Sequence, residues 1–396
     1  MGYVVLGTGG VGSQVIRLLN GSYDGDVSAV FNSSGGHGAD AVKQYRDWLN
    51  GKNSGTFSTW LRDVNEGSMK VGDGAGKGID GAAWETVAWN DVLSDPGVDT
   101  VFVALPSEGK YHPDKRTLEA LESGKNVVSC EKYTLANRFS ELVPYIRSGK
   151  YGFTATVGGG TGIPRAIMED VKKNGKFDAF YGIINGTTNH ILTRYSEGIP
   201  LEDAAYEAVI NGYAEKGSSG AREVIWKEIE DVRKKATIIY NLTLYSAGKE
   251  GYISESDIKL PSGGDKDAIS YLEGIHNGGG GEKMEGAPKV KLLACVRKRD
   301  EPSLIKKMIT SHDANGYVLE IGFAENPPKE LGNIDGVYNG AVVLRDGVCK
   351  RLVNKGHGAG AEITAKTMIG DLARMTESYR PAGLATGGAG PYSVLN

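Results

Sequence analysis

Apolar and polar positions at the start of the chain predict a buried strand that leads directly into a helix. The strand covers Tyr3 to Leu6, and a glycine-rich turn separates it from the helix. Apolar residues at helical spacing indicate that helix, namely Val11, Val15, Leu18 and Leu19. A second apolar run, Val27 to Phe31, follows about 20 residues later, as a strand–helix–strand unit requires.

The alternation of strands and helices continues toward residue 132. Apolar runs at Asp99 to Pro106 and Gly124 to Lys132 enclose a helical stretch that starts at Pro113. This pattern predicts a doubly wound parallel sheet. Lys132 then lies just past the carboxyl end of a strand, the edge at which such sheets bind ligands. Position alone does not separate a binding lysine from an exposed loop lysine.

Small polar residues join a strand to a helix within the segment Tyr181 to Tyr195. They are Asn185, Gly186, Thr187, Thr188 and Asn189. Such residues turn the chain and cap helices well, and their amides and hydroxyls can equally hold a polar substrate. The local pattern leaves both interpretations open.

Asp231 and Lys235 lie one turn apart in a predicted helix that ends the segment Asn211 to Leu242. An arbitrary pair of this kind is a surface ion pair worth roughly 0.2 to 0.5 kcal/mol. At about 100° per residue, however, both fall within the apolar arc of the helix, whereas Glu230, Arg233 and Lys234 are expected to point away. A charged pair on a buried face needs partners or a ligand, so the two residues are a candidate site.

Composition limits the classes of function. A chain of 396 residues favours two domains, and its net charge of −4 gives no reason to expect a nucleic-acid or membrane partner. Three distant cysteines, Cys130, Cys295 and Cys349, show no zinc or disulfide spacing and fit a reducing cytoplasm. No apolar run approaches about 18 residues, so we expect a soluble chain without a signal peptide.

Glycine is abundant, with 58 residues. We expect surface loops at Ser33 to Gly38, Gly72 to Gly81 and Gly278 to Gly281, and an irregular excursion or a mobile flap from Pro261 to Pro288.

The turn after the first strand reads GTGGVG, in which Gly7, Gly9 and Gly12 have the spacing of the dinucleotide fingerprint. The first glycine permits the tight turn, the second lets backbone approach a pyrophosphate, and the third lets the helix pack on the strand. A purely structural turn is the alternative, and the position between strand and helix favours the nucleotide site.

The end of the second strand carries Asn32, Ser33 and Ser34 where an acidic residue would normally bind the ribose of NAD. Lys43 and Arg46 are the nearest cations in the sequence. The choice between NAD and NADP therefore stays open.

Several motifs, in order, resemble the homoserine dehydrogenase family through most of the chain. They are GTGGVG, GKNVVSCEK, TVGGG (Thr156 to Gly160), INGTTNHIL, NGYAE (Asn211 to Glu215), DVRKKATI (Asp231 to Ile238) and GHGAGAEITAKTMIGDL (Gly356 to Leu372). Similar proteins reduce aspartate 4-semialdehyde to homoserine with NAD(P)H. The resemblance implies this activity, an amino-acid substrate, a cytoplasmic homodimer and NAD or NADP as cofactor.

The resemblance also implies roles for particular residues. The expected catalytic residues are Lys235, Lys132 and Asp231, and the expected substrate-binding residues are Gly186, Thr187, Tyr213 and Glu215. The expected cofactor-binding residues are Gly7, Thr8, Gly9, Gly10, Val11, Gly12, Asn32, Ser33, Ser34, Leu105, Lys132 and Gly358. No metal is expected, because His190 and His357 lack partners at ligand spacing.

The chemistry requires a proton donor and a positive charge beside the oxygen of the aldehyde, and a lysine can supply both. We expect Lys235 to be the acid/base group and Lys132 to assist. A lysine pKa would have to fall for this work; burial and a second lysine lower it, and Asp231 opposes the change.

The expected fold is α/β, with a Rossmann-type domain at residues 1–150 that is completed by residues 362–396. Residues 151–361 are expected to form an α+β substrate and dimerisation domain with an open sheet. No C-terminal regulatory domain is expected.

The segment between Glu215 and Asp231 departs from the family pattern. Trp226 and Ile229 stand near the places of a usual Asp and Gly, and Glu228 is a possible replacement for the missing carboxylate. Thr154 stands where related proteins often have a Glu that helps to hold a monovalent cation, and Glu131 replaces an Asn. A dehydrogenase for another small aldehyde or hydroxy acid, a catalytically silent dinucleotide sensor and a structural subunit therefore remain as alternatives.

Overall fold

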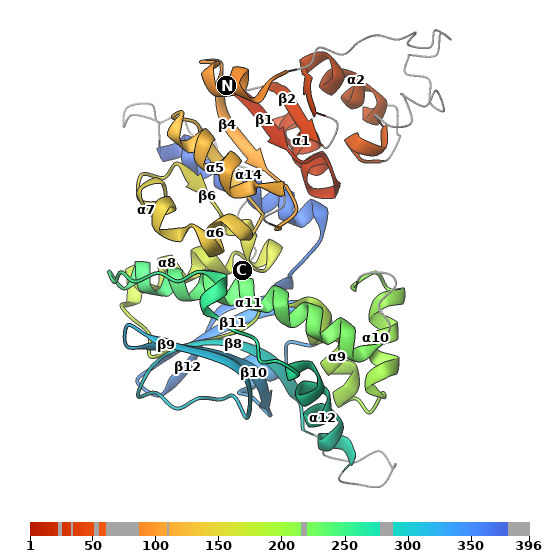
Figure 1. The fold of residues 1–396 in the computed structure, drawn as a ribbon, viewed down its shortest axis with the longest axis vertical. Helices are drawn as coiled ribbons and strands as arrows, with labels where there is room; N and C mark the ends of the chain where they lie inside the picture. The colour runs from red at the N-terminus through yellow and green to blue at the C-terminus, as the bar shows by residue number, and fades with distance from the viewer. Residues whose placement is uncertain are drawn as a thin grey trace.

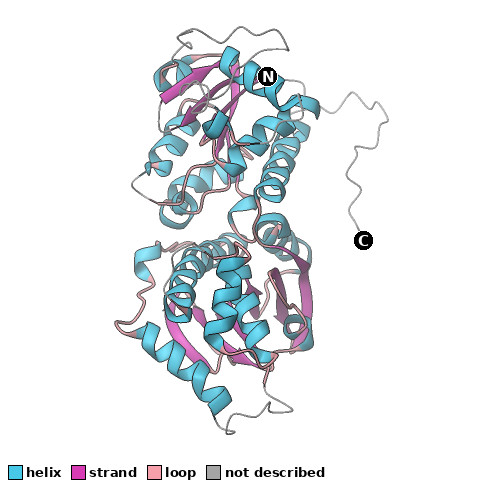
Figure 2. Ribbon diagram, turned by 90° about the vertical axis from the view of Figure 1, so that its right-hand side faces the viewer, coloured by secondary structure: helices cyan, strands magenta, loops and turns pink. Residues whose placement is uncertain are grey.

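The computed structural model describes residues 1–22, 26–32, 35–50, 55–60, 87–108, 111–214, 220–277 and 288–378. They form two lobes stacked along the long axis of the molecule (Figure 1), and each lobe is built on a six-stranded sheet. Figure 2 shows from a second direction that helices flank the strands of both lobes.

The first lobe contains the parallel sheet, in the order β3-β2-β1-β4-β5-β6. Its strands are β1 (Gly2–Leu6), β2 (Asp26–Asn32), β3 (Gly35–Gly38), β4 (Val98–Val103), β5 (Asn126–Ser129) and β6 (Tyr151–Gly152). Only β3 among them runs antiparallel to its neighbour. The helices of this lobe that lie wholly within the described residues are α1 (Gly10–Ser22), α2 (Ala39–Asn50), α4 (Trp89–Ser94), α5 (Pro113–Glu122), α6 (Tyr133–Asn137), α7 (Phe139–Arg147) and α14 (Ala361–Ser378).

The C-terminal helix α14 packs along α1, far from it in sequence (Figure 1). Ala365, Met368 and Leu372 of α14 join a buried cluster with Val15 and Leu19 of α1. The apolar face of α14 therefore covers the same side of the parallel sheet as α1. The proposed division of the chain into domains at residues 150 and 362 stays a prediction.

The second lobe contains an antiparallel sheet, in the order β12-β11-β7-β8-β10-β9. Its strands are β7 (Ala179–Ile183), β8 (Val290–Lys298), β9 (Lys307–Ala314), β10 (Tyr317–Glu325), β11 (Tyr338–Arg345) and β12 (Val348–His357). Its helices are α8 (Ile163–Asn174), α9 (Gly186–Ser196), α10 (Leu201–Ile210), α11 (Ala221–Ser246), α12 (Gly264–Asn277) and α13 (Lys329–Gly332). The sheet is open, with β12 and β9 at its edges.

The central strands of this sheet, β7, β8, β10 and β11, are buried on both faces, whereas the edge strands β9 and β12 carry exposed residues. Along β8, Leu292 and Val296 pack into the core that contains α11, while Leu293 and Cys295 pack on the other side with Leu331. The predicted fold class, a Rossmann-type parallel sheet with a second α+β lobe, is confirmed.

Two predictions about glycine-rich segments were wrong. Gly35–Gly38 are part of a strand and not a surface loop, and a side chain at Gly36 would strike the carbonyl oxygen of Val87. Gly264–Asn277 form the helix α12 within the supposed irregular excursion, because Ala268 and Leu272 recur at helical spacing and are buried. The other two glycine-rich stretches lie outside the described residues.

None of the helices in the described part of the chain combines the length and apolar character that crossing a bilayer demands.

Candidate active site

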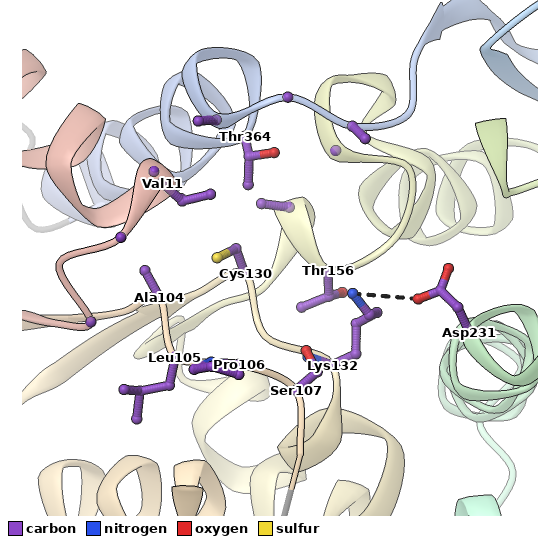
Figure 3. Close-up of a pocket in the computed structure, with 18 of the residues that line it drawn as sticks. Val11, Ala104, Leu105, Pro106, Ser107, Cys130, Lys132, Thr156, Asp231 and Thr364 are labelled. Carbon is purple, nitrogen blue, oxygen red and sulfur yellow. Dashed lines mark hydrogen bonds and ion pairs between the residues drawn. The ribbon is translucent and has the colours of Figure 1, made fainter. Parts of the chain in front are cut away.

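A cleft of about 1440 Å³ lies where the two lobes meet. Its walls come from the ends of β1, β4 and β5 in the first lobe, from α9 and α11 in the second, and from the connection between β12 and α14. Figure 3 shows this cleft with Lys132 directed toward Asp231. The carboxyl edge of the parallel sheet therefore opens onto residues of the second lobe.

The cleft brings together most of the site residues predicted from the sequence. The predicted residues that line it are Gly7, Thr8, Gly9, Gly10, Val11, Asn32, Leu105, Lys132, Gly186, Thr187, Tyr213, Asp231, Lys235 and Gly358. Gly12 does not line it, and Ser33, Ser34 and Glu215 lie outside the described residues.

The glycine turn has the geometry of an anion site. Gly7 has φ of 90°, and a side chain there would strike the carbonyl oxygen of Ala104, while a side chain at Gly12 would strike that of Gly7. A Cβ at Gly9, in contrast, would meet nothing within 4 Å. Helix α1 begins at Gly10 with its amino end at the cleft. Bare backbone and a helix amino terminus together fit the pyrophosphate of a dinucleotide.

The end of β2 was only partly predicted. Asn32 lines the cleft, but the cations nearest in sequence do not: Lys43 is exposed on α2, and Arg46 lies 3.6 Å from Asp26. Trp89 and Arg116 line this end instead. Sequence reasoning missed both, because only the packing of α4 and α5 brings them beside β2.

A carboxylate between two ammonium groups forms the centre of the cleft. Asp231 Oδ2 lies 2.6 Å from Lys235 Nζ. Asp231 Oδ1 lies 3.5 Å from Lys132 Nζ, and Figure 3 marks this second ion pair with a dashed line. Lys235 Nζ also donates to the carbonyl oxygen of Ile184 at 2.9 Å. The backbone N–H of Lys132 donates to Ser107 Oγ at 2.8 Å, which holds the start of α6 against the loop after β4. The three charges thus come from two lobes.

The pKa values of this cluster follow from burial and charge. Burial opposes ionisation of Asp231, but the two ammonium groups outweigh it and hold the pKa of Asp231 well below its ordinary range. Burial also opposes the charge on Lys132, but Asp231 outweighs it, and the pKa of Lys132 is raised. The fall in pKa that acid/base work would need is therefore not found at Lys132, because the attraction of Asp231 exceeds the burial effect. Lys132 is an ammonium at neutral pH.

The polar turn before α9 both caps the helix and reaches the site. Asn185 Oδ1 accepts from the backbone N–H of Thr188 at 2.9 Å, as a helix cap does. The same side chain donates to Glu228 Oε2 at 2.5 Å and to Asp231 Oδ2 at 3.2 Å. Asn189 instead donates to backbone carbonyl groups outside the cleft. The two interpretations of this turn are therefore not exclusive.

The floor beside this turn is built by α9 and the end of α10. Thr187 Oγ1 donates to the carbonyl oxygen of Tyr213 at 2.7 Å, and the Tyr213 ring packs 5.0 Å from that of His190. A side chain at Gly186 would lie 2.5 Å from the carbonyl oxygen of Val337. Any larger residue at Gly186 would force the backbone at Val337 away from α9.

Glu228 is a second carboxylate of the cleft, one turn before Asp231 on α11. Burial raises its pKa, and the neighbouring charge of Asp231 adds to the increase, against the hydrogen bond from Asn185. Within the described residues no ion pair joins Glu228 to a lysine or arginine. Trp226, in contrast, does not line the cleft, and Ile229 is fully buried.

Thr154, where a cation-binding Glu was considered, makes a different contact. Its backbone N–H and its hydroxyl donate to Asp371 of α14 at 2.8 and 2.6 Å, and Arg374 pairs with the same carboxylate. Over the described ranges, no group of three or more His, Cys, Asp or Glu side chains is arranged to hold a metal ion. Thr154 therefore fastens α14 to the segment that leads into the second lobe.

Comparison with known proteins gives concordant matches. The family model for homoserine dehydrogenase matches residues 163–373, more than half of the chain. The homoserine dehydrogenase of Mycobacterium leprae is 28% identical over 380 residues, covering 94% of this chain and 71% of that protein. The one from Neisseria gonorrhoeae is 31% identical over 268 residues, covering 66% of this chain and 54% of that protein.

Solved structures share the fold. A putative homoserine dehydrogenase from Archaeoglobus fulgidus superposes with a TM-score of 0.61 at 22% identity, covering 95% of this chain and 99% of that chain. A hyperthermophilic archaeal homoserine dehydrogenase in complex with NADPH superposes with a TM-score of 0.61 at 18% identity, covering 96% and 98%. The chain therefore belongs to the homoserine dehydrogenase family, whose members are NAD(P)-dependent oxidoreductases.

Proposed function

We propose that this protein interconverts L-aspartate 4-semialdehyde and L-homoserine with NAD or NADP, using Lys235 as the acid/base group and Lys132 as a fixed positive charge. One observation carries this proposal. The ammonium groups of Lys132 and Lys235 meet at Asp231 inside the cleft that also contains the glycine turn.

Lys235 has the hydrogen-bonding capacity for proton transfer. An ammonium group has three donors, and Asp231 and the carbonyl oxygen of Ile184 take two of them. The third has no partner among the described residues, and we propose that it donates to a substrate oxygen in the cleft. When bound, the nicotinamide supplies or accepts the hydride. During aldehyde reduction Lys235 gives its proton to the developing alkoxide, and during alcohol oxidation it takes the hydroxyl proton.

Lys132 acts through its charge. Its raised pKa keeps it protonated, so it can stabilise negative charge on the substrate oxygen. Asp231 holds both lysines in place and offsets part of their mutual repulsion. From the family likeness, Gly186, Thr187, Tyr213 and Glu215 are proposed to surround the amino-acid end of the substrate.

Glu228 is proposed to bind the ammonium group of the substrate. Asp231 is neutralised by two lysines, whereas Glu228 forms no ion pair with a described lysine or arginine and faces the same cleft. A partly buried carboxylate is stabilised by a cationic partner, and the α-ammonium of an amino acid supplies one. Glu228 would then replace the carboxylate of the Asp that the family usually has near the position of Trp226.

The assembly and location follow the family likeness as well. We propose a cytoplasmic homodimer with a small amino-acid substrate and without a nucleic-acid or membrane partner. Size-exclusion chromatography with light scattering would test the dimer directly.

The experiment follows absorbance at the nicotinamide band with homoserine and each cofactor. We expect turnover by the wild type and a loss of more than about 100-fold in kcat for Lys235→Ala, the scale of acid/base groups. Lys227→Ala is the matched control, because Lys227 lies exposed on the same helix and pairs with Glu223 at 2.9 Å. Full activity of Lys235→Ala would contradict the assignment.

The same assay separates the alternatives. Turnover on another small alcohol but not on homoserine would indicate a different dehydrogenase of this fold. Cofactor binding without turnover on any small alcohol would favour a sensor, and absence of cofactor binding would favour a structural subunit.

A further inference from the structure

The nucleotide end of the cleft has an aromatic wall beside the end of β2. Trp89, only 8% exposed, packs edge-on against Phe31 with ring centroids 5.7 Å apart. Its indole N–H donates to Glu119 Oε2 at 2.7 Å. Phe31 directly precedes Asn32 on β2, so these contacts hold the indole next to the strand end at which a Rossmann sheet meets the adenosine ribose.

Arg116 lies over this wall. Its guanidinium carbon is 5.2 Å from the centre of the Trp89 ring, and the side chain, 42% exposed, lines the cleft. Arg116 Nη1 lies 3.5 Å from the Glu119 oxygen that also accepts from Trp89. Stacking and this long hydrogen bond orient the guanidinium, and most of its five donors have no partner among the described residues.

The charges along the cleft are distributed unevenly. The carboxylates among its described lining residues are Glu228 and Asp231, and both lie on α11 at the substrate end. At the other end β2 finishes with the neutral Asn32. A phosphate at this strand end would therefore meet no carboxylate of the described lining, and it would share the Arg116 guanidinium with Glu119, which lies 3.5 Å from Nη1.

We propose that the cleft selects NADP(H) over NAD(H) and that Arg116 binds the 2′-phosphate that distinguishes them. This proposal rests on the proposed function only in requiring a nicotinamide dinucleotide in the cleft. A planar guanidinium can donate two parallel hydrogen bonds to a phosphate, whereas a ribose hydroxyl offers neither the charge nor the paired acceptors. A carboxylate in place of Asn32 would favour the hydroxyl instead.

The test measures cofactor binding without substrate, from the fluorescence of NADPH and of NADH titrated with protein. We expect the wild type to bind NADPH at least about tenfold more tightly than NADH. Arg116→Ala is expected to raise the Kd of NADPH about 10- to 100-fold, the range for hydrogen bonds to charged groups, and to change the Kd of NADH less than about twofold. Arg116→Lys should retain part of the preference, because the charge remains but the paired donors do not.

Lys115→Ala is the matched control. Lys115 precedes Arg116, carries the same charge and also approaches Glu119, at 3.8 Å, but it does not line the cleft. The control should bind both cofactors as the wild type does. Added salt should weaken NADPH binding more than NADH binding in the wild type and equally in Arg116→Ala, since the exposed guanidinium is screened.

Three results would overturn the proposal. One is a wild type that prefers NADH, and another is an equal loss of both cofactors in Arg116→Ala, which would assign the guanidinium to the shared adenosine. The third is an unchanged preference in Arg116→Ala whose melting temperature matches the wild type. Because no homoserine is present, a selective loss of NADPH supports the proposal even if the protein fails to turn over homoserine.

Discussion

Asp231→Asn removes one negative charge from the centre of the cleft with almost no change in shape. Its carboxylate lies 2.6 Å from one ammonium group and 3.5 Å from the other. At an effective dielectric constant of about 20, unit charges at such separations attract by roughly 5 to 6 kcal/mol. Burial of the charges offsets much of this attraction, and the variant leaves two partly buried ammonium groups facing each other.

The expected loss of unfolding free energy is about 3 kcal/mol. Removing one partner of a buried pair costs about 3 to 5 kcal/mol. We take the lower end because the side chains of Asp231 and Lys132 are 26% and 24% exposed, so that water screens part of their interaction. With an unfolding entropy of about 2.1 cal/mol/K per residue, the 396-residue chain should lose about 4 °C of melting temperature in scanning calorimetry at neutral pH.

Glu230→Gln is the matched control. Glu230 is the preceding residue of α11, carries the same charge and is exposed, so its variant should melt within about 1 °C of the wild type. The double variant Asp231→Asn/Lys132→Met should recover part of the loss, because it removes one of the unpaired ammonium groups. If Asp231→Asn and Glu230→Gln have the same melting temperature, the charge cluster does not stabilise the fold and the reasoning is refuted.

The stability difference between the wild type and Asp231→Asn should depend on pH in a definite direction. The folded pKa of Asp231 lies below 3.8, so its contribution is present above that pH and is lost as pH falls through the folded pKa. The folded pKa of Lys132 lies above 10.5, so its contribution is present below 10.5 and is lost as pH rises through the folded pKa. The difference in unfolding free energy between the wild type and Asp231→Asn should be constant between about pH 5 and 10. It should become smaller below pH 3.8.

Three further substitutions separate effects on folding from effects on binding. Gly12→Ala should lower the melting temperature because its methyl group would strike the Gly7 carbonyl oxygen, whereas Gly9→Ala should melt like the wild type and bind NADPH more weakly in a fluorescence titration. The opposite pattern would show that the roles of the two glycines are reversed. Glu228→Gln should raise KM for homoserine by about 10-fold or more, because that is the effect expected from losing a hydrogen bond to a charged group. The affinity for NADPH should change little. An unchanged KM would exclude Glu228 as the ammonium partner.

The sequence by itself determined the local parts of the nucleotide site. The strand, the glycine turn and helix α1 follow from an apolar run and from the backbone freedom of Gly7, which depend only on neighbouring residues. The inward direction of Asp231 and Lys235 followed in the same way from the rotation per residue of a helix. The helical spacing of Ala268 and Leu272 also indicates helix α12, although the glycine-rich sequence around it led us to expect irregular structure.

Only the tertiary structure decided which of these parts meet. Lys132 reaches Asp231 because the first lobe packs against α11, and that contact sets the direction of the lysine's pKa, which burial alone would have reversed. Arg116 reaches the end of β2 through Trp89, which no spacing in the sequence indicates. The physical reason is range: steric and helical preferences act over a few residues, whereas charge, burial and cleft geometry depend on segments that only folding brings within a few ångströms of each other.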